Sequence, residues 1–185
     1  MGGRKHATVL LSGGIDSAAC ASFLLAQGMS VSAMFVDHGQ AAALHERKAV
    51  DALAEHLHIE VTHLSFSGAP SFGSGELVGR NAFLVFAALF ASRAESSTIG
   101  LGLHAGTPYY DCSPSFVQLI NRAVAEHTDN TVHVSAPFIE WSKSEVFSYF
   151  VDAGLPVAHT YSCERGMIPP CGRCASCLDR RVLGC

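Results

Sequence analysis

The sequence predicts an α/β fold with a Rossmann-like architecture, in which helices cover both faces of a parallel sheet. Apolar runs that suit strands alternate with helix-like segments along most of the chain. The runs 9–11 and 31–36 are mostly apolar, as expected for strands buried on both faces of a parallel sheet. A Gly-rich turn joins the first of these runs to a helix-like segment. A chain of 185 residues, 49% of them hydrophobic, is long enough to bury one full core.

Each expected element follows from a local pattern of apolar, turn and capping residues. The expected strands are 8–11, 31–36, 60–64, 98–103 and 131–135. The expected helices are 18–27, 44–57, 81–94, 115–127 and 142–153.

Turn and capping residues set several of the expected ends. Gly28 stops the first helix, and Ser142 with Glu145 forms a capping box that opens the last one. Helix 81–94 is almost wholly apolar and is therefore expected to be buried. Segment 65–78 is rich in Gly, Ser and Pro, and a loop of that length is often a lid or a binding loop.

A glycine turn, Ser12-Gly13-Gly14-Ile15-Asp16-Ser17, follows the first expected strand and opens the first expected helix. Its two glycines let the backbone approach an anion closely, and the first N–H groups of a helix point at such an anion without internal partners. Its two serines can add hydroxyl donors. Asp16 would be repelled by a phosphate, so its expected role is to hold a Mg²⁺ that bridges to the phosphate. The turn is therefore a candidate phosphate cradle, and an ordinary tight turn with an Asp or Ser cap is the alternative.

The glycine turn lacks the Lys of a Walker A loop, which excludes a standard P-loop NTPase. Three loops, 12–17, 37–40 and 104–111, each follow an expected strand. Since ligands bind at the carboxyl ends of parallel strands, these loops are expected to converge on one site.

Composition and charge exclude several classes of protein. The net charge is −4 with His neutral, which argues against a general nucleic-acid-binding surface. No apolar run reaches the roughly 18 residues that span a bilayer. Residues 1–6 lead straight into the first strand without a cleavable signal. We therefore expect a cytoplasmic protein, in which the seven Cys serve a metal or catalysis in preference to disulfides.

Four of the cysteines form a knuckle-like cluster, and they are Cys163, Cys171, Cys174 and Cys177. Four thiolates can close a tetrahedral shell around Zn²⁺, and such a closed site is structural because it leaves no open position. Buried free cysteines and an iron–sulfur cluster are the alternatives. The expected division is an α/β domain over 1–160 and a zinc-binding segment over 161–185 that packs on the same domain.

The glycine turn and the cysteine cluster, with further matches between them, resemble the QueC family of 7-cyano-7-deazaguanine synthases within the N-type ATP pyrophosphatases. The resemblance runs from Val9 to Arg180. It implies the fold of the adenine nucleotide alpha hydrolases (the HUP class) with a C-terminal four-cysteine zinc knuckle. The matching motifs are the glycine turn, Asp37-x-Gly39-Gln40, Gly79-Arg80-Asn81, Gly102, Tyr110-Asp111-Cys112-x-Pro114-x-Phe116, Pro137, Lys143, Ser162-Cys163 and Cys171-Gly172-x-Cys174-x-x-Cys177-x-x-Arg180.

The resemblance implies an ATP- and Mg²⁺-dependent ligase with structural Zn²⁺. Members of the family adenylate the carboxylate of 7-carboxy-7-deazaguanine, and ammonia displaces AMP to give an amide. A second ATP activates that amide, and loss of AMP leaves a nitrile that serves queuosine-type tRNA modification. Family enzymes are often homodimers.

The resemblance also implies roles for individual residues. The glycine turn holds the pyrophosphate through Ser12, Gly13, Gly14, Asp16 and Ser17. Arg80 and Lys143 join the ATP-binding group, and Asp16, Ser17 and Lys143 form the catalytic group. The implied substrate-binding residues are His38, Gln40, Asn81, Tyr110 and Asp111.

Plainer interpretations stay open for several of these residues. Lys143 can be an exposed residue in the first turn of its helix, and Arg80 a solvated residue at a helix start. Asp111 can be a turn residue. His38, which stands where the family has Tyr, can stack on a base or be a satisfied loop residue.

The chain departs from the family pattern at several positions near the expected site. Ala41-Ala42 stand where the family has Arg-His, and Ser113 follows Asp111-Cys112 where the family has Arg. Thr107 replaces a family acid, and most of the C-terminal helix after the cysteines is missing. These losses fit a QueC-like paralogue of bacterial antiphage defence, which attaches a deazaguanine to an amine of an operon-encoded partner protein.

Two further functions compete with these. A tRNA sulfur transferase of the same superfamily would need a reactive cysteine near the turn, for which Cys112 and Cys20 are the candidates. A non-catalytic module that keeps the nucleotide-binding fold is disfavoured by the intact Asp16 and Ser17.

Overall fold

The computed structural model describes residues 5–68, 72, 75–92 and 96–185. Within them lies one parallel sheet in the order β3-β2-β1-β4-β5. The strands are β1 (His6–Leu10), β2 (Ser30–Asp37), β3 (Val61–Ser65), β4 (Ser96–Gly100) and β5 (His133–Ser135). The α-helices are α1 (Ile15–Ala26), α2 (Ala43–Leu57), α3 (Arg80–Ala91), α4 (Pro114–His127), α5 (Lys143–Asp152) and α6 (Ala175–Leu183). Two short 3₁₀-helices, η1 (Tyr110–Cys112) and η2 (Val157–His159), complete the described elements.

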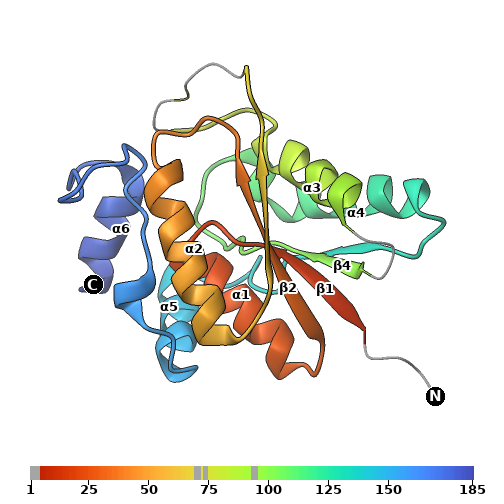
Figure 1. Cartoon of the computed structure of the whole chain (residues 1–185), viewed down its shortest axis with the longest axis horizontal. Helices are drawn as coiled ribbons and strands as arrows, with labels where there is room; N and C mark the ends of the chain where they lie inside the picture. Colours follow the sequence, from red (N-terminus) through yellow and green to blue (C-terminus); the bar gives the residue numbers. More distant parts are fainter. Residues whose placement is uncertain (1–4, 69–71, 73–74, 93–95) are drawn as a thin grey trace.

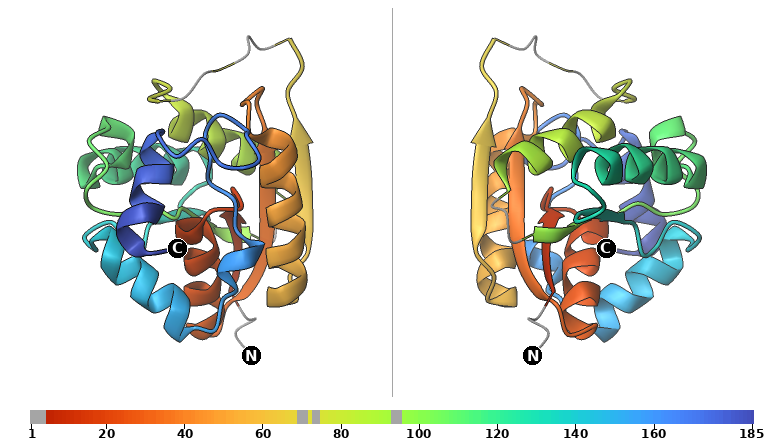
Figure 2. Two further views of the ribbon diagram at one scale, coloured as in Figure 1. Left: turned by 90° about the vertical axis from the view of Figure 1, so that its left-hand side faces the viewer. Right: turned by 90° about the vertical axis from the view of Figure 1, so that its right-hand side faces the viewer.

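Helices cover both faces of the sheet, which confirms the predicted fold class (Figure 1). Helices α1, α2 and α5 lie on one face, whereas α3 and α4 lie on the other (Figure 2). Residues of β1 alternate between the two cores: Ala7 and Val9 pack with α1 and α5, and Leu10 packs with α3 and α4. Both faces of the central strands are therefore buried, as the apolar runs predict.

The order of the strands places a crevice beside β1. The chain passes from β1 to β2 on one side and reaches β4 on the other, so the connections leave the ends of β1 and β4 in opposite directions. In sheets of this kind ligands bind at the carboxyl ends of the strands, at this switch point. The glycine turn leaves β1 at that end.

Several predicted boundaries differ from the structure. Helix α1 begins at Ile15, three residues before the expected start, because Asp16 and Ser17 form the first helical turn. The strand expected over 98–103 ends at Gly100. The capping box of Ser142 and Glu145 is confirmed. Helix α6 and both 3₁₀-helices were not predicted.

The expectation that helix 81–94 is buried is wrong for one of its faces. Val85 and Ala88 of α3 are in the core, but Phe83, Phe86 and Phe90 are exposed, Phe90 by 93%. Residues 93–95, at the expected end of this helix, lie outside the described residues. So do residues 1–4 and, within the expected loop 65–78, residues 69–71 and 73–74.

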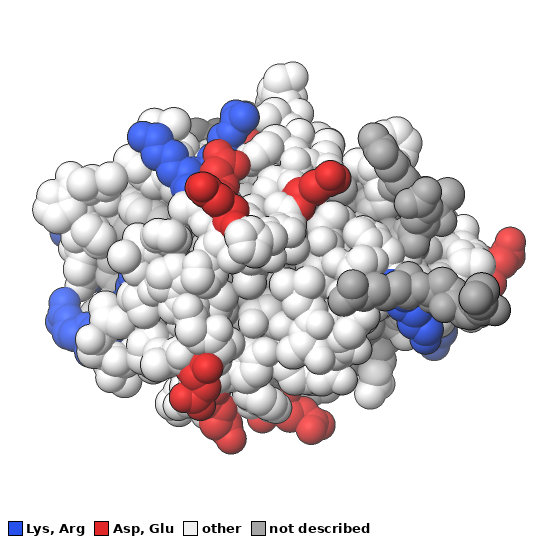
Figure 3. Space-filling model, turned by 60° about the horizontal axis from the view of Figure 1, so that its bottom comes forward, with Lys and Arg blue, Asp and Glu red and all other residues white. Residues whose placement is uncertain are grey.

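Two expectations about partners can be compared with the described part of the chain. No helix in it is long and apolar enough to cross a membrane. On the face drawn in Figure 3, Lys and Arg side chains lie at a few separate places and form no continuous basic patch.

Candidate functional site

The glycine turn presents the start of α1 without a side-chain cap. Gly14 is the N-cap residue, and no side chain accepts a hydrogen bond from the first N–H groups of the helix. The hydroxyls of Ser12 and Ser17 lie 3.1 Å apart, and Ser17 Oγ donates to the carbonyl of Gly14. The backbone N–H of Ser12 donates to Ser17 Oγ. The turn is thus ordered by its own serines while its helix N-terminus can receive an anion.

Gly13 fixes the turn against α2 and cannot carry a side chain there. Its φ is +81°, a left-handed value, and a Cβ at this position would lie 2.8 Å from the carbonyl oxygen of Glu46. Gly102, just beyond β4, approaches the turn equally closely from the other side: a Cβ there would lie 2.5 Å from the carbonyl carbon of Asp16. Two glycines therefore let neighbouring backbones close around the start of α1.

The substitution Gly13→Ala is expected to destabilise the protein and to abolish nucleotide binding. The left-handed φ alone costs about 1 to 3 kcal/mol for a residue with a Cβ, and the overlap with Glu46 must also shift the turn. Gly28→Ala is the matched control, because Gly28 has the same φ of +81° with nothing within 4 Å of its Cβ position. Thermal unfolding and ATP titration of both variants measure the two effects. Equal ATP affinity in the two variants would contradict the assigned role of the close contact.

Asp16 lies in a small charged group at the start of α1. Lys143 Nζ, from the first turn of α5, donates to Asp16 Oδ2 at 2.5 Å, and His104 Nε2 lies 3.9 Å from the same oxygen. The other oxygen, Asp16 Oδ1, is buried and has no hydrogen-bond partner. An unpartnered buried carboxylate oxygen is suited to a divalent cation. The residues present at this point therefore fit a Mg²⁺ ion.

A cavity of about 760 Å³ opens over this group. The three expected loops all contribute to its wall, as do the starts of α3 and α5 and the C-terminal segment. Of the predicted site residues, the structure places these at the cavity: Ser12, Gly14, Asp16, Ser17, His38, Gln40, Arg80, Asn81 and Lys143. The other three predicted for ATP or substrate, Gly13, Tyr110 and Asp111, do not line the cavity.

Asp111 is occupied by contacts within the protein. Its side chain is buried, and Asp111 Oδ2 accepts a hydrogen bond from the backbone N–H of Asn81 at the start of α3. The Asn81 side chain in turn donates to the Asp111 carbonyl at 2.9 Å. Cys112 and Tyr109 line the cavity instead. Asp111 thus joins η1 to α3, while Cys112 and Tyr109 face the cavity.

A second polar group lies where β2 ends. The Gln40 side chain donates to Glu46 Oε2 at 2.8 Å and accepts a hydrogen bond from the His38 backbone. Burial raises the pKa of Glu46, and Gln40 and the Arg80 charge oppose this effect. Burial lowers the pKa of His38, because it disfavours the charged form of the ring. The Nε2 atom of His38 is buried without a hydrogen-bond partner. Gln40 and His38 thus face the cavity with one unsatisfied ring nitrogen.

Several cavity residues were not identified as site residues from the sequence. Among them are Glu46, His104, Tyr109 and Arg180. His104 and Tyr109 lie in the loop 104–111, which was predicted to face the site. Arg180 belongs to the last matched motif. Glu46 lies on the helix expected over 44–57, which was predicted from its apolar positions alone. No local pattern distinguishes Glu46 from the other polar residues of that helix.

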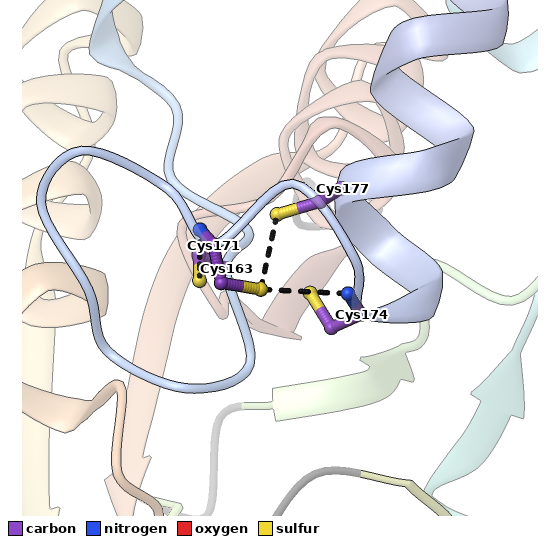
Figure 4. A group of neighbouring side chains, drawn as sticks. All are labelled: Cys163, Cys171, Cys174 and Cys177. Atoms are coloured by element: carbon purple, nitrogen blue, oxygen red, sulfur yellow. Dashed lines mark hydrogen bonds between the residues drawn. The ribbon is translucent and has the colours of Figure 1, made fainter.

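The four cysteines of the predicted zinc knuckle come together (Figure 4). Their Sγ atoms all lie within 4.8 Å of one another, with Cys171 and Cys177 3.9 Å apart. Burial would raise the pKa of Cys163, but backbone N–H groups of Cys171, Met167 and Arg165 lower it to about 6. Burial and the neighbouring thiols raise the pKa of Cys177 to about 12. A cation that displaces these protons would bind all four sulfurs, so the donor set fits a structural Zn²⁺.

The segment that carries the four cysteines contacts the glycine turn directly. The backbone N–H of Tyr161 donates to the Gly13 carbonyl at 2.9 Å. Gly166 packs so closely on the Ala41 carbonyl that a Cβ there would overlap it. Glu164 accepts hydrogen bonds from both the N–H and the hydroxyl of Ser176, at 3.0 Å each. The knuckle therefore forms one wall of the candidate site.

Known proteins match nearly the whole chain. A family model described as "Queuosine biosynthesis protein QueC" matches residues 6–81 and 77–182. The 7-cyano-7-deazaguanine synthase of Halobacterium salinarum is 31% identical over 204 residues, covering 95% of this chain and 89% of that protein. The enzyme of the same name from Aquifex aeolicus is 32% identical over 209 residues, covering 96% of each chain. The resemblance drawn from the motifs is therefore confirmed.

A solved structure supports the fold alone. The predicted subunit of a tRNA methyltransferase from Methanocaldococcus jannaschii superposes with a TM-score of 0.54 at 13% sequence identity. The match covers 80% of this chain and 74% of that one.

Proposed function

The chain belongs to the QueC family of queuosine biosynthesis proteins, and from this premise we propose that it makes 7-cyano-7-deazaguanine. In this proposal it adenylates 7-carboxy-7-deazaguanine with ATP, and ammonia displaces AMP to give the amide. A second ATP adenylates the amide oxygen with release of pyrophosphate, and loss of AMP and of the two amide N–H protons leaves the nitrile. The relatives' shared name, 7-cyano-7-deazaguanine synthase, supports the product. The individual steps and residue roles are proposals.

The observation that carries the proposal is the uncapped helix start beside Asp16. The free N–H groups of the glycine turn suit the pyrophosphate of ATP, and Lys143 supplies a cation within 2.5 Å of Asp16. Asp16 would hold Mg²⁺ through its unpartnered Oδ1. That ion would neutralise charge on the leaving pyrophosphate. The carboxylate of the acid attacks the α-phosphorus, the bond to the β-phosphate oxygen breaks, and pyrophosphate leaves.

The second substrate is proposed to lie beyond the α-phosphate, on the His38, Gln40 and Asn81 side of the cavity. The unsatisfied Nε2 of His38 offers a polar contact to a purine-like ring. The amide of Asn81 already binds Asp111 and Arg80, so Asn81 would shape this side of the cavity. Asp111 is assigned a supporting role in this proposal, because its carboxylate already binds the backbone of Asn81. Tyr109 and Cys112 take the positions at the cavity that the sequence assigned to Tyr110 and Asp111.

Product identification tests the proposal. The purified protein is incubated with 7-carboxy-7-deazaguanine, MgATP and ammonium, and the products are analysed by mass spectrometry. We expect AMP, pyrophosphate and the nitrile. Formation of AMP without amide or nitrile would contradict ammonia as the acceptor. A mass gain on an operon-encoded partner protein would favour the conjugating alternative. That alternative was raised because Ala41, Ala42 and Ser113 stand at positions where the family has Arg or His. The relatives named above give no support to a role in antiphage defence, and the cytoplasmic location stays a prediction.

The tRNA sulfur transferase alternative requires a reactive cysteine, and Cys112 is poorly suited to that role. Burial and the Asp111 charge raise the pKa of Cys112 to about 11. At pH 8 only about one Cys112 thiol in a thousand is then ionised. Cys20, the other candidate, is fully buried and has its pKa raised to about 12 by burial.

Alkylation is expected to leave Cys112 unmodified. Native protein treated with iodoacetamide at pH 8 should be labelled at Cys185, which is exposed, and not at the buried Cys112. Peptide mass spectrometry measures both sites in one sample, so Cys185 serves as the internal control. Labelling of Cys112 at the rate of Cys185 would revive the sulfur-transfer function.

The homodimer implied by the family is proposed to form through α3. Phe83, Phe86 and Phe90 are exposed on this helix, and Phe66 packs edge-to-face on Phe83 at 4.8 Å between ring centroids. Exposed aromatic surface of this extent is typical of protein interfaces. We expect light scattering to give the mass of a dimer, and Phe90→Glu to give that of a monomer. A wild-type monomer would contradict this proposal.

A further inference from the structure

Arg180 lines the cavity and forms no ion pair with another described residue. It lies on α6, three residues after the last cysteine of the knuckle, and lines the same cavity as Asp16 and Lys143. The ion pairs of the described residues join His63 to Asp51 and link Asp16 to Lys143 and His104. Arg180 takes part in none of these.

The guanidinium of Arg180 is hydrogen-bonded through Nη2, whereas its Nε has no acceptor. Nη2 of Arg180 donates to Thr160 Oγ1. The next residue, Tyr161, donates its backbone N–H to the glycine turn. Nε is buried and has no hydrogen-bond partner. A buried N–H of a charged group that lacks an acceptor is costly, and a guanidinium offers a planar fork that fits oxyanions. The side chain is therefore anchored on Thr160 while Nε lacks an acceptor.

The other cations at the cavity are already engaged. Lys143 is paired with Asp16, and Nε of Arg80 donates to the side chain of Asn81. Among the Lys and Arg side chains at the cavity, Arg80 and Arg180 form none of the ion pairs of the described residues. Arg180 differs from Arg80 in having a buried Nε without an acceptor, at a cavity whose proposed ligands are anionic.

We propose that Arg180 is an oxyanion-binding residue of this site, supplied by the helix that follows the zinc knuckle. The inference rests on the proposed function for its second ligand, since a nucleotide phosphate and the carboxylate of the acid present the same chemistry to a guanidinium. It gives the knuckle a direct part in ligand binding besides its structural one. Arg173 has no such position: its side chain is exposed on the knuckle and does not line the cavity.

Binding measurements on Arg180→Gln, Arg180→Lys and the matched control Arg173→Gln test the proposal. The probes are α,β-methylene-ATP against adenosine, and 7-carboxy-7-deazaguanine against its neutral amide. Zinc content and thermal unfolding are measured for each variant, so that a displaced α6 is recognised. Arg180→Lys keeps the charge and serves as the conservative variant.

We expect Arg180→Gln to weaken one anionic probe about 10- to 100-fold, the range for loss of a charged hydrogen bond, and to leave its neutral counterpart unchanged. Loss of the nucleotide analogue assigns Arg180 to a phosphate, and loss of the acid assigns it to the carboxylate. Arg180→Lys should recover part of the affinity, and Arg173→Gln should bind as the wild type does.

Two outcomes would overturn the inference. One is that Arg180→Gln binds every probe within twofold of wild type, and the other is that neutral and anionic probes weaken equally. If wild-type protein binds the nucleotide but not the acid, the proposed function fails while the nucleotide measurements still decide the role of Arg180.

Discussion

Replacing Asp16 by Ala is expected to reduce AMP formation by at least about 100-fold, the cost of losing one charge-stabilising group at a reacting centre. Asp16 is the one carboxylate at the start of α1, and its Oδ1 is the buried oxygen left without a partner. The substitution would remove the proposed Mg²⁺ ligand and leave Lys143 without the oxygen to which it donates. Pyrophosphate release in the presence of ATP, acid and ammonium measures the effect.

Asp179→Asn is the control for this experiment. Asp179 also lines the cavity and carries the same charge, but it is exposed on α6 and forms none of the ion pairs of the described residues. We expect it to retain AMP formation within a few-fold of wild type. If Asp16→Ala retained wild-type AMP formation, the assignment of the glycine turn to ATP would have to be given up.

Replacing Cys174 by Ser is expected to release the metal and with it most of the activity. Cys174 is the N-cap residue of α6. Its Sγ is one of the four cysteine Sγ atoms that all lie within 4.8 Å of one another. Metal binding supplies about 10 to 16 kcal/mol in small zinc domains, so losing a ligand should free the segment that contains Tyr161 and Arg180. Zinc content by elemental analysis, thermal unfolding and ATP affinity should all fall together.

Cys185→Ser is the matched control, because this cysteine is exposed and lies outside the cluster. It should keep its zinc and its ATP affinity. Chelation of the wild-type protein should reproduce the Cys174→Ser result. Full ATP affinity after complete removal of zinc would contradict the coupling between the knuckle and the glycine turn.

The fold was predictable because its main signals are local. Mostly apolar runs gave the buried strands, and Ser142 with Glu145 gave the start of α5. The exposed face of α3 was not predictable, since an apolar helix that packs in a core and one that packs at an interface have the same composition. The start of α1 was misplaced because Asp16 and Ser17 suit either a turn or a first helical turn.

The candidate site was predictable where residues adjoin in sequence, and less so where tertiary packing selects them. The glycine turn and the cysteine spacing identify their own groups. Tyr110 and Asp111 were assigned to the cavity from a motif, whereas the 3₁₀ turn η1 brings Tyr109 and Cys112 to it, three residues apart. The contact of Arg180 with Thr160 joins segments 20 residues apart, and no local pattern shows it.

The hydrogen bond from Tyr161 to Gly13 also bears on how the protein matures during synthesis. The first strand and the glycine turn leave the ribosome early, but a backbone partner of that turn is made some 150 residues later. A nascent chain that stops before residue 161 therefore lacks this partner of the glycine turn, even though it contains most of the sheet. ATP binding by this protein is expected to arise late in translation, after the cysteines have been made and have found their metal.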